Sequence, residues 1–292
     1  MSGARMTINL LLDRLAFAGT ARIPEESPVM DDPGHADAFD AAGSDGGILA
    51  FLYLYHAIQA TTVIRPGDTV LDLACGSANQ LLQTAMLNPE ADFVGVDASA
   101  RMLDKANALV ERHGVRNIQV RLGDMTDLTE FAVESVDCVT CTMSLHHLAD
   151  NRALASAFSE MGRILRRNGG VYVADFGRMN RSATMRHFSE DWKDEQSAAF
   201  TRDFLHSLHA AFTVSELATA AANAGHAMKR FTTPLAPFLV VCKTGERREW
   251  TAQMALRAQQ RYEMLTRGQQ RKFHALSRWL RAGGCRLPSR IQ

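Results

Sequence analysis

Short apolar runs alternate with amphipathic stretches along most of the chain between Thr69 and Thr244. The runs have the length and composition of buried strands, and the stretches between them have helical spacing. This alternation predicts an α/β fold in which a parallel sheet is covered by helices on both faces. The runs are TVLDLA, DFVGVDA, IQVRLGD, VDCVTCTM, GGVYVADF and FLVVCKT, and the helices are expected at 79–86, 100–112, 152–165 and 214–224.

Further elements are expected outside this alternating pattern. Residues 7–18 and the apolar run 48–64 predict helices, whereas residues 24–47 are rich in Asp, Gly, Pro and Ala and predict an irregular loop. Residues 178–212 form a helical insertion after the fifth run, which suits either a lid over a site or an arm for oligomerisation. The sequence TVSE that follows has the spacing of a capping box, so a helix should begin there.

Composition limits the class of protein. With 46% hydrophobic and 22% charged residues, the chain should fold as one sizeable globular domain with appendages. Neither a signal-peptide core nor an apolar stretch of membrane-spanning length is evident, so we expect a cytoplasmic protein without a membrane partner. The five cysteines are scattered, which favours reduced thiols. Cys138 and Cys141 lie within one predicted strand, where side chains three apart point to opposite faces and would not chelate a metal together.

The net charge of zero conceals an uneven distribution, because residues 246–292 contain eleven Arg and Lys against three Glu. One interpretation is a solvated basic helix that packs on an acidic body or on a second subunit. The other is a surface for an anionic partner such as RNA. A nucleic-acid partner is the less favoured of the two, and a homodimer remains open.

Acidic residues close three successive predicted strands. Asp72 precedes a turn of small residues, Ala74, Gly76 and Ala78, against which the backbone of a ligand could pack closely. Asp97 ends the second strand, where a carboxylate can accept hydrogen bonds from a ribose diol. Asp124 ends the third. Ligands bind beyond the carboxyl ends of the strands in such sheets, so a nucleotide site is expected there.

These motifs resemble those of the class I S-adenosylmethionine-dependent methyltransferases over Ile64 to Lys243. VLDLACGSA is similar to the family's first motif, FVGVDAS to the second, LGDM to the third, CVTCTMSLHHL to the fourth and LRRNGGVYVADF to the strand after them. The resemblance implies a Rossmann-like, doubly wound, mostly parallel seven-stranded sheet. Together with the pattern of the flanking residues, it divides the chain into three parts: an N-terminal helical or lid segment 1–63, a cofactor-binding core 64–245 that contains the insertion 178–212, and a basic helical extension 246–292.

The resemblance also implies S-adenosylmethionine as the cofactor. Asp72 would lie near its methionine moiety, Asp97 would hold the ribose hydroxyls and Asp124 the adenine amine. The other residues assigned to the cofactor are Ala74, Gly76, Ala98, Met102, Met125 and Met143. One departure matters, because the first and third glycines of the family's loop are Ala74 and Ala78 here. A Cβ at a positive φ costs about 1 kcal/mol, which would weaken the cofactor site.

Methyl transfer from a sulfonium needs alignment more than acid–base help. His147, just past the fourth strand, is the candidate general base, and the candidate substrate residues are Tyr53, His56, His146 and Phe176. The chain lacks the N/D-P-P-Y/F turn of amino-methylating enzymes, and no set of ligands defines a metal site. The sequence therefore predicts methylation of an O, N or C nucleophile of a small metabolite. The alternatives are an RNA or protein methyltransferase that uses the basic tail, and a non-catalytic methyltransferase-like partner subunit.

Overall fold

A seven-stranded sheet organises the molecule, with the strand order β3-β2-β1-β4-β5-β7-β6. The computed structural model describes residues 3–17, 19–27, 29–289 and 291. Strands β1 to β5 run parallel, whereas β7 is antiparallel to both β5 and β6. The doubly wound, mostly parallel sheet predicted from the sequence is confirmed. The strands are β1 Thr69–Leu73, β2 Asp92–Asp97, β3 Ile118–Leu122, β4 Val136–Thr142, β5 Leu165–Phe176, β6 Lys229–Thr232 and β7 Leu239–Lys243.

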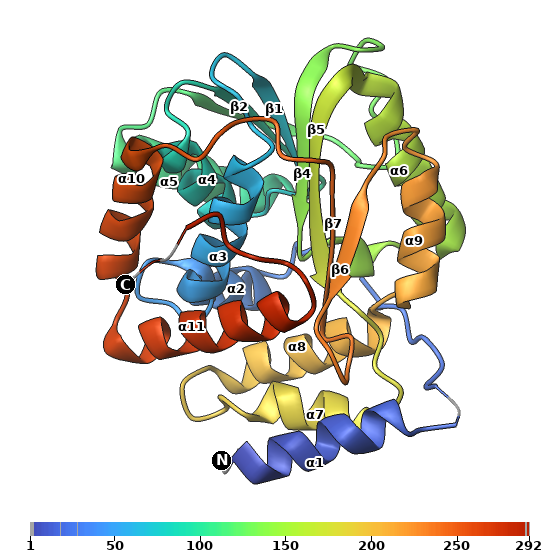
Figure 1. The fold of residues 1–292 in the computed structure, drawn as a ribbon. Coiled ribbons are helices and arrows are strands. Elements are labelled where there is room, and N and C mark those ends of the chain that lie inside the picture. Colours follow the sequence, from blue (N-terminus) through green and yellow to red (C-terminus); the bar gives the residue numbers. More distant parts are fainter. Residues whose placement is uncertain (1–2, 18, 28, 290, 292) are drawn as a thin grey trace.

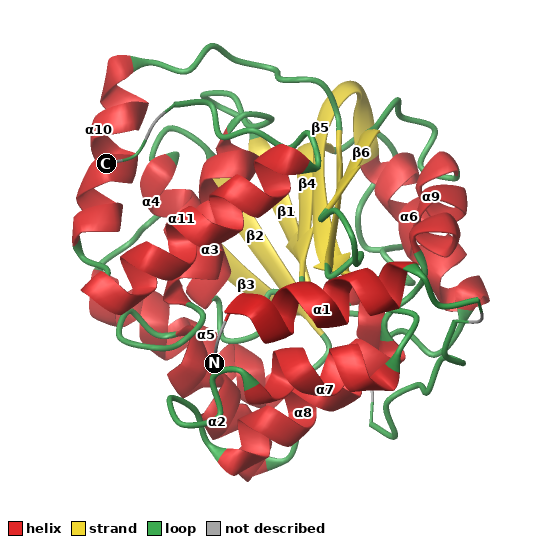
Figure 2. Ribbon diagram, turned by 60° about the horizontal axis from the view of Figure 1, so that its bottom comes forward, coloured by secondary structure: helices red, strands yellow, loops and turns green. Residues whose placement is uncertain are grey.

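Helices cover both faces of the sheet (Figure 1). On one face, α3 and α4 pack together with α10 and α11, and on the other α6 packs against α9. A third group, α1, α7 and α8, lies beyond the carboxyl ends of the parallel strands (Figure 2). The helices are α1 Gly3–Arg14, α2 Pro33–Gly43, α3 Ala50–Thr61, α4 Asn79–Leu87, α5 Ala100–His113, α6 Asn151–Ile164, α7 Ser182–Glu190, α8 Ala198–Ala210, α9 Val214–Ala222, α10 Ala252–Glu263 and α11 Arg267–Ala282, with a 3₁₀ turn η1 at Leu145–His147.

Side-chain caps place several helix starts where the sequence predicted them. Thr213 and Glu216 form the expected capping box of α9. Ser99 accepts from the backbone N–H of Met102 at the start of α5, and Asp150 accepts from two amides at the start of α6. These caps fix the points at which the chain leaves the sheet edge, which is where the site is found.

Two expectations about local structure were wrong. Residues 24–47 are not wholly irregular, because α2 begins at Pro33 with Asp32 as its cap. A Pro at the first helical position after an Asp is a helix-start signal that the high Asp, Gly and Pro content concealed. The edge strand β6 was also missed, since its sequence KRFT is short and carries two cations. Ala18, assigned to the first helix, lies outside the described residues.

The C-terminal segment forms part of the body. Phe273 and Leu280 of α11 are fully buried in the same cluster as α3 and α4. Ion pairs join the C-terminal segment to acidic residues of the rest of the chain: Arg247–Asp68 at 2.6 Å, Arg257–Glu90 at 3.0 Å, Arg261–Asp45 at 2.9 Å and Lys272–Glu195 at 2.7 Å.

No described helix has the length and apolar character required to cross a bilayer.

Candidate functional site

The loop between β1 and α4 has a strained backbone. Ala74, Gly76 and Ala78 adopt φ values of 51°, 55° and 62°, all in the left-handed region. Glycine takes this conformation freely, whereas each alanine costs about 1 kcal/mol. The positions at which the resemblance implies glycines thus adopt the left-handed backbone that glycine favours, although two of them are alanines.

Asp97 holds this loop from the end of β2. Its Oδ2 accepts from the backbone N–H of Gly76 at 2.7 Å, and its Oδ1 accepts from the N–H of Ser99 at 2.9 Å. Burial raises the pKa of the Asp97 carboxyl above its ordinary value, although both amide donors act in the opposite direction.

Asp124 lies in a more open position at the end of β3. Its Oδ1 accepts from both the backbone N–H and the hydroxyl of Thr126, each at 2.8 Å. The side chain is exposed, so it is free to meet a ligand from solvent. Asp97 and Asp124 thus present carboxylates at neighbouring strand ends.

A cavity of about 290 Å³ lies against these strand ends. It fits a nucleoside, because small residues form one wall, apolar side chains form another and two carboxylates face it as acceptors for hydroxyl and amine groups. All the residues assigned to the cofactor line it except Asp72: they are Ala74, Gly76, Asp97, Ala98, Met102, Asp124, Met125 and Met143.

Asp72 is buried behind the loop. Its Oδ1 accepts from the hydroxyl of Thr140 at 2.6 Å. Burial raises the pKa of the Asp72 carboxyl to about 7, against the effect of that hydrogen bond. Its predicted proximity to the methionine moiety remains a prediction, since its side chain supports β1 and β4 from inside.

Two adjacent histidines follow β4 in the turn η1. His146 is buried, and its Nδ1 lies 2.7 Å from Oδ1 of Asp175, whose Oδ2 accepts from the backbone N–H of His146 at 2.8 Å. Burial alone would lower the pKa of His146, but the charge and hydrogen bond of Asp175 outweigh it and raise that pKa. The sequence did not identify Asp175 as a partner.

His147 has a carboxylate partner from a remote part of the chain. Its Nδ1 is in hydrogen-bond contact with Oε2 of Glu25, and the hydroxyl of Ser207 donates to the other carboxylate oxygen at 2.9 Å. Burial would raise the pKa of Glu25, but the hydrogen bond and charge of His147 lower it to about 2. Nothing in the sequence around Glu25 distinguishes it from any surface acid.

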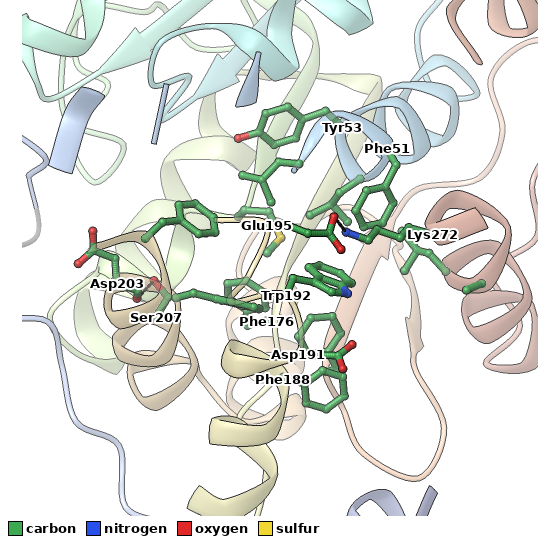
Figure 3. A pocket seen from close by; sticks show the side chains of 18 of the residues that line it. Phe51, Tyr53, Phe176, Phe188, Asp191, Trp192, Glu195, Asp203, Ser207 and Lys272 are labelled. Atoms are coloured by element: carbon green, nitrogen blue, oxygen red, sulfur yellow. Dashed lines mark hydrogen bonds and ion pairs between the residues drawn. The ribbon is translucent and has the colours of Figure 1, made fainter. Parts of the chain in front are cut away.

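A second cavity of about 830 Å³ adjoins the first. Figure 3 shows side chains that line this larger cavity. Met30, Phe39, Met143 and His147 line both. Met143 has a φ of 58°, a strained conformation of the kind often found at functional sites. Of the predicted substrate residues, Tyr53, His146 and Phe176 line this larger cavity.

Aromatic side chains from α3 and from the insertion surround the larger cavity. Trp192 packs edge-on against Phe51 with ring centroids 5.6 Å apart, and the ammonium of Lys272 lies 4.4 Å from the Trp192 ring centroid. Lys272 also pairs with Glu195, which lines the same cavity, as Figure 3 shows. The insertion and the C-terminal helix therefore close one side of this cavity together.

His56 corrects one prediction, because the structure gives it no access to either cavity. Its ring is fully buried, and its Nδ1 lies 2.6 Å from the hydroxyl of Tyr172. Burial lowers the pKa of His56 to about 3, which keeps the imidazole neutral. The helix α3 turns Tyr53 toward the cavity and His56 toward the sheet, a difference that residue type alone did not reveal.

The fold and the two cavities define a Rossmann-like α/β protein with a cavity at the carboxyl ends of its parallel strands. Residues 64–254 match the family described as "Methyltransferase domain". The chain therefore belongs to the class I S-adenosylmethionine-dependent methyltransferase family, as the motifs predicted.

Individual relatives are more distant. The chain is 33% identical over 117 residues to a demethylmenaquinone methyltransferase of Symbiobacterium thermophilum, covering 39% of this chain and 45% of the relative. It is 30% identical over 115 residues to the uncharacterised methyltransferase YcgJ of Bacillus subtilis, covering 39% of this chain and 43% of the relative. The match thus spans less than half the length of these relatives.

A solved structure of similar fold is an O-methyltransferase family protein from Burkholderia thailandensis. It superposes with a TM-score of 0.55 at 18% sequence identity, covering 74% of this chain and 61% of the other. This likeness concerns the fold.

Proposed function

We propose that this protein transfers the methyl group of S-adenosylmethionine to an O, N or C nucleophile of a bulky, largely apolar small molecule. The observation that carries the proposal is the meeting of two cavities at Met143 and His147. A cofactor in the smaller cavity and an acceptor in the larger one would come together at that junction.

The residues of the smaller cavity suit the cofactor, which supplies an activated methyl group when bound. Asp97 and Asp124 would accept hydrogen bonds from ribose hydroxyls and adenine amine, and Met102 and Met125 would flank the ring. The protein's remaining task is to align the acceptor and exclude water.

The larger cavity favours an acceptor with apolar rings. Its walls are mainly aromatic and aliphatic, with contributions from Phe176, Trp192, Phe204 and Phe238. A polar metabolite would leave these walls poorly matched. We infer a substrate larger and less polar than a simple organic acid.

Two imidazoles line the larger cavity, where either could accept a proton from the acceptor molecule. His147 is the base predicted from the sequence, and its contact with Glu25 gives it a fixed orientation. His146, held by Asp175, is a second candidate from the same turn. Comparing kcat for His146→Gln and His147→Gln decides between them.

The basic C-terminal segment does not favour the RNA alternative. Four of its cations pair with acids of the body, and its apolar side chains lie in the core. The non-catalytic alternative has one observation in its favour, the strain at Ala74 and Ala78.

The decisive experiment measures cofactor and acceptor separately. Calorimetric titration with S-adenosylhomocysteine should show one site, and radiolabelled methyl transfer should be screened against hydroxylated polycyclic compounds. Asp124→Ala should weaken the binding of S-adenosylhomocysteine. Trp192→Ala should raise the KM for the acceptor and leave the Kd for S-adenosylhomocysteine unchanged. No heat and no melting shift with millimolar S-adenosylhomocysteine would refute the proposal and favour a scaffold role.

A further inference from the structure

We propose that Glu25, His146 and His147 form a binding site for one divalent transition-metal ion of the Zn²⁺ type beside the junction of the two cavities. One potential ligand atom from each of these residues lies within 4.8 Å of the other two. Two imidazoles and a carboxylate are a donor set that binds Zn²⁺ and its first-row neighbours.

The two histidines are fixed on one side of this site by the turn η1. Their ring centroids are 4.3 Å apart. Nδ1 of His146 already contacts Asp175 at 2.7 Å, which leaves Nε2 as the nitrogen available to an ion. A carboxylate on the second ring nitrogen is the usual partner of a metal-binding histidine, because it fixes the ring and strengthens the ligand.

Glu25 is held opposite the histidines by its own neighbours. Ser207 donates to its Oε1, and the nearby Arg22 donates from Nη2 to the backbone carbonyl of His146 at 3.0 Å. The segment that contains Glu25 is thus attached to the turn that contains the histidines. An ion between Glu25 and His147 would replace the hydrogen bond between their side chains.

The site has an open side, because His146 and His147 both line the larger cavity. Three protein ligands with a free position facing a cavity are typical of catalytic metal sites. This step rests on the proposed function. An ion in the site would bind an oxygen nucleophile of the acceptor at the free position and favour the ionised form of that oxygen. In the metal-bound protein the histidines would be ligands, so the role of proton acceptor would apply only to the metal-free protein.

This proposal departs from the prediction that no residues define a metal site. The sequence showed His146 and His147 as neighbours but gave no carboxylate for them. Glu25 is 122 residues from His147 in the chain.

The test uses the full-length, tag-free protein stripped with a chelator and titrated calorimetrically with Zn²⁺, and with Co²⁺ for its visible absorption. We expect one equivalent to bind. Glu25→Gln and His147→Gln should each weaken binding at least about tenfold, and Asp175→Asn by about 10- to 100-fold. The matched controls Glu26→Gln and His226→Gln should bind as the wild type does, and Mg²⁺ should not compete.

Absence of a stoichiometric site, or equal affinity in the wild type, Glu25→Gln and His147→Gln, would overturn the inference. If Asp175→Asn fails to fold, the other two variants decide. Titration of the same samples with S-adenosylhomocysteine separates the two proposals. Cofactor binding without metal binding would refute the metal site alone, and metal binding without cofactor binding would refute the proposed function alone.

Discussion

Oδ2 of Asp97 and the backbone nitrogen of Gly76 lie 2.7 Å apart, so the carboxylate at the end of β2 supports the loop that follows β1. Asp97→Ala should therefore remove both a ligand contact and a loop contact. We expect cofactor affinity to fall by about 1–3 kcal/mol. Titration with S-adenosylhomocysteine measures this, with Asp92→Ala at the exposed start of β2 as the control. Unchanged affinity would contradict the assignment of Asp97 to the ribose.

Replacing the strained alanines by glycine should affect the two positions differently. Ala74 is partly exposed, so Ala74→Gly should relieve its positive φ and stabilise the fold by about 0.5–1 kcal/mol. Ala78 is fully buried, so Ala78→Gly should gain the same relief but lose about 0.8 kcal/mol of methyl burial. Urea unfolding measures both, and Ala132→Gly at an exposed loop position is the control. A larger gain at Ala78 than at Ala74 would contradict this account.

Asp72 should make the ligand-free protein less stable as the pH rises. Its folded pKa of about 7 exceeds the ordinary value of 3.8, so between pH 4 and pH 7 the folded state binds more protons than the unfolded state. Its contribution should fall by something on the order of 4 kcal/mol across that range. Asp72→Asn should flatten the pH profile of the unfolding free energy relative to the wild type, whereas Asp92→Asn should not. An unaltered profile in Asp72→Asn would show that the carboxyl titrates normally.

Two arginines of the C-terminal segment should differ in their contribution to stability. Arg247 and Asp68 are largely buried, so Arg247→Ala should destabilise the protein by about 3–5 kcal/mol by leaving a buried carboxylate unpaired. Arg257 pairs with the more exposed Glu90, so Arg257→Ala should cost less than about 1 kcal/mol. Chemical denaturation of both variants provides the comparison, and equal losses would argue against it.

Removal of residues 246–292 should abolish the fold. Met254, Tyr262, Phe273 and Leu280 are buried, so deletion would expose the core around α3. We expect a protein without a cooperative thermal transition. A truncated protein with the wild-type melting temperature would instead restore the interpretation of the segment as a separate binding tail.

Most of the sheet, and the strand ends that line the smaller cavity, could be predicted from the sequence. Apolar runs must be buried and a parallel sheet places all their carboxyl ends at one edge, so Asp97 and Asp124 had to come close together. The alternation of strands and helices is encoded by residues that are close together in the sequence, so it can be predicted without the tertiary structure. For the same reason the helices between the strands were found, whereas α2 and β6, whose apolar signals are weak, were missed.

The way in which side chains from remote segments meet could be seen only in the folded molecule. His56 lies in the interior, the basic C-terminal segment pairs with acidic residues of the body, and Glu25 contacts His147. These contacts depend on the direction of side chains across many intervening elements, and no periodicity within the chain encodes such a direction. The smaller cavity lies mainly at the ends of neighbouring strands, whereas the groups beside it come from segments that are far apart in the chain.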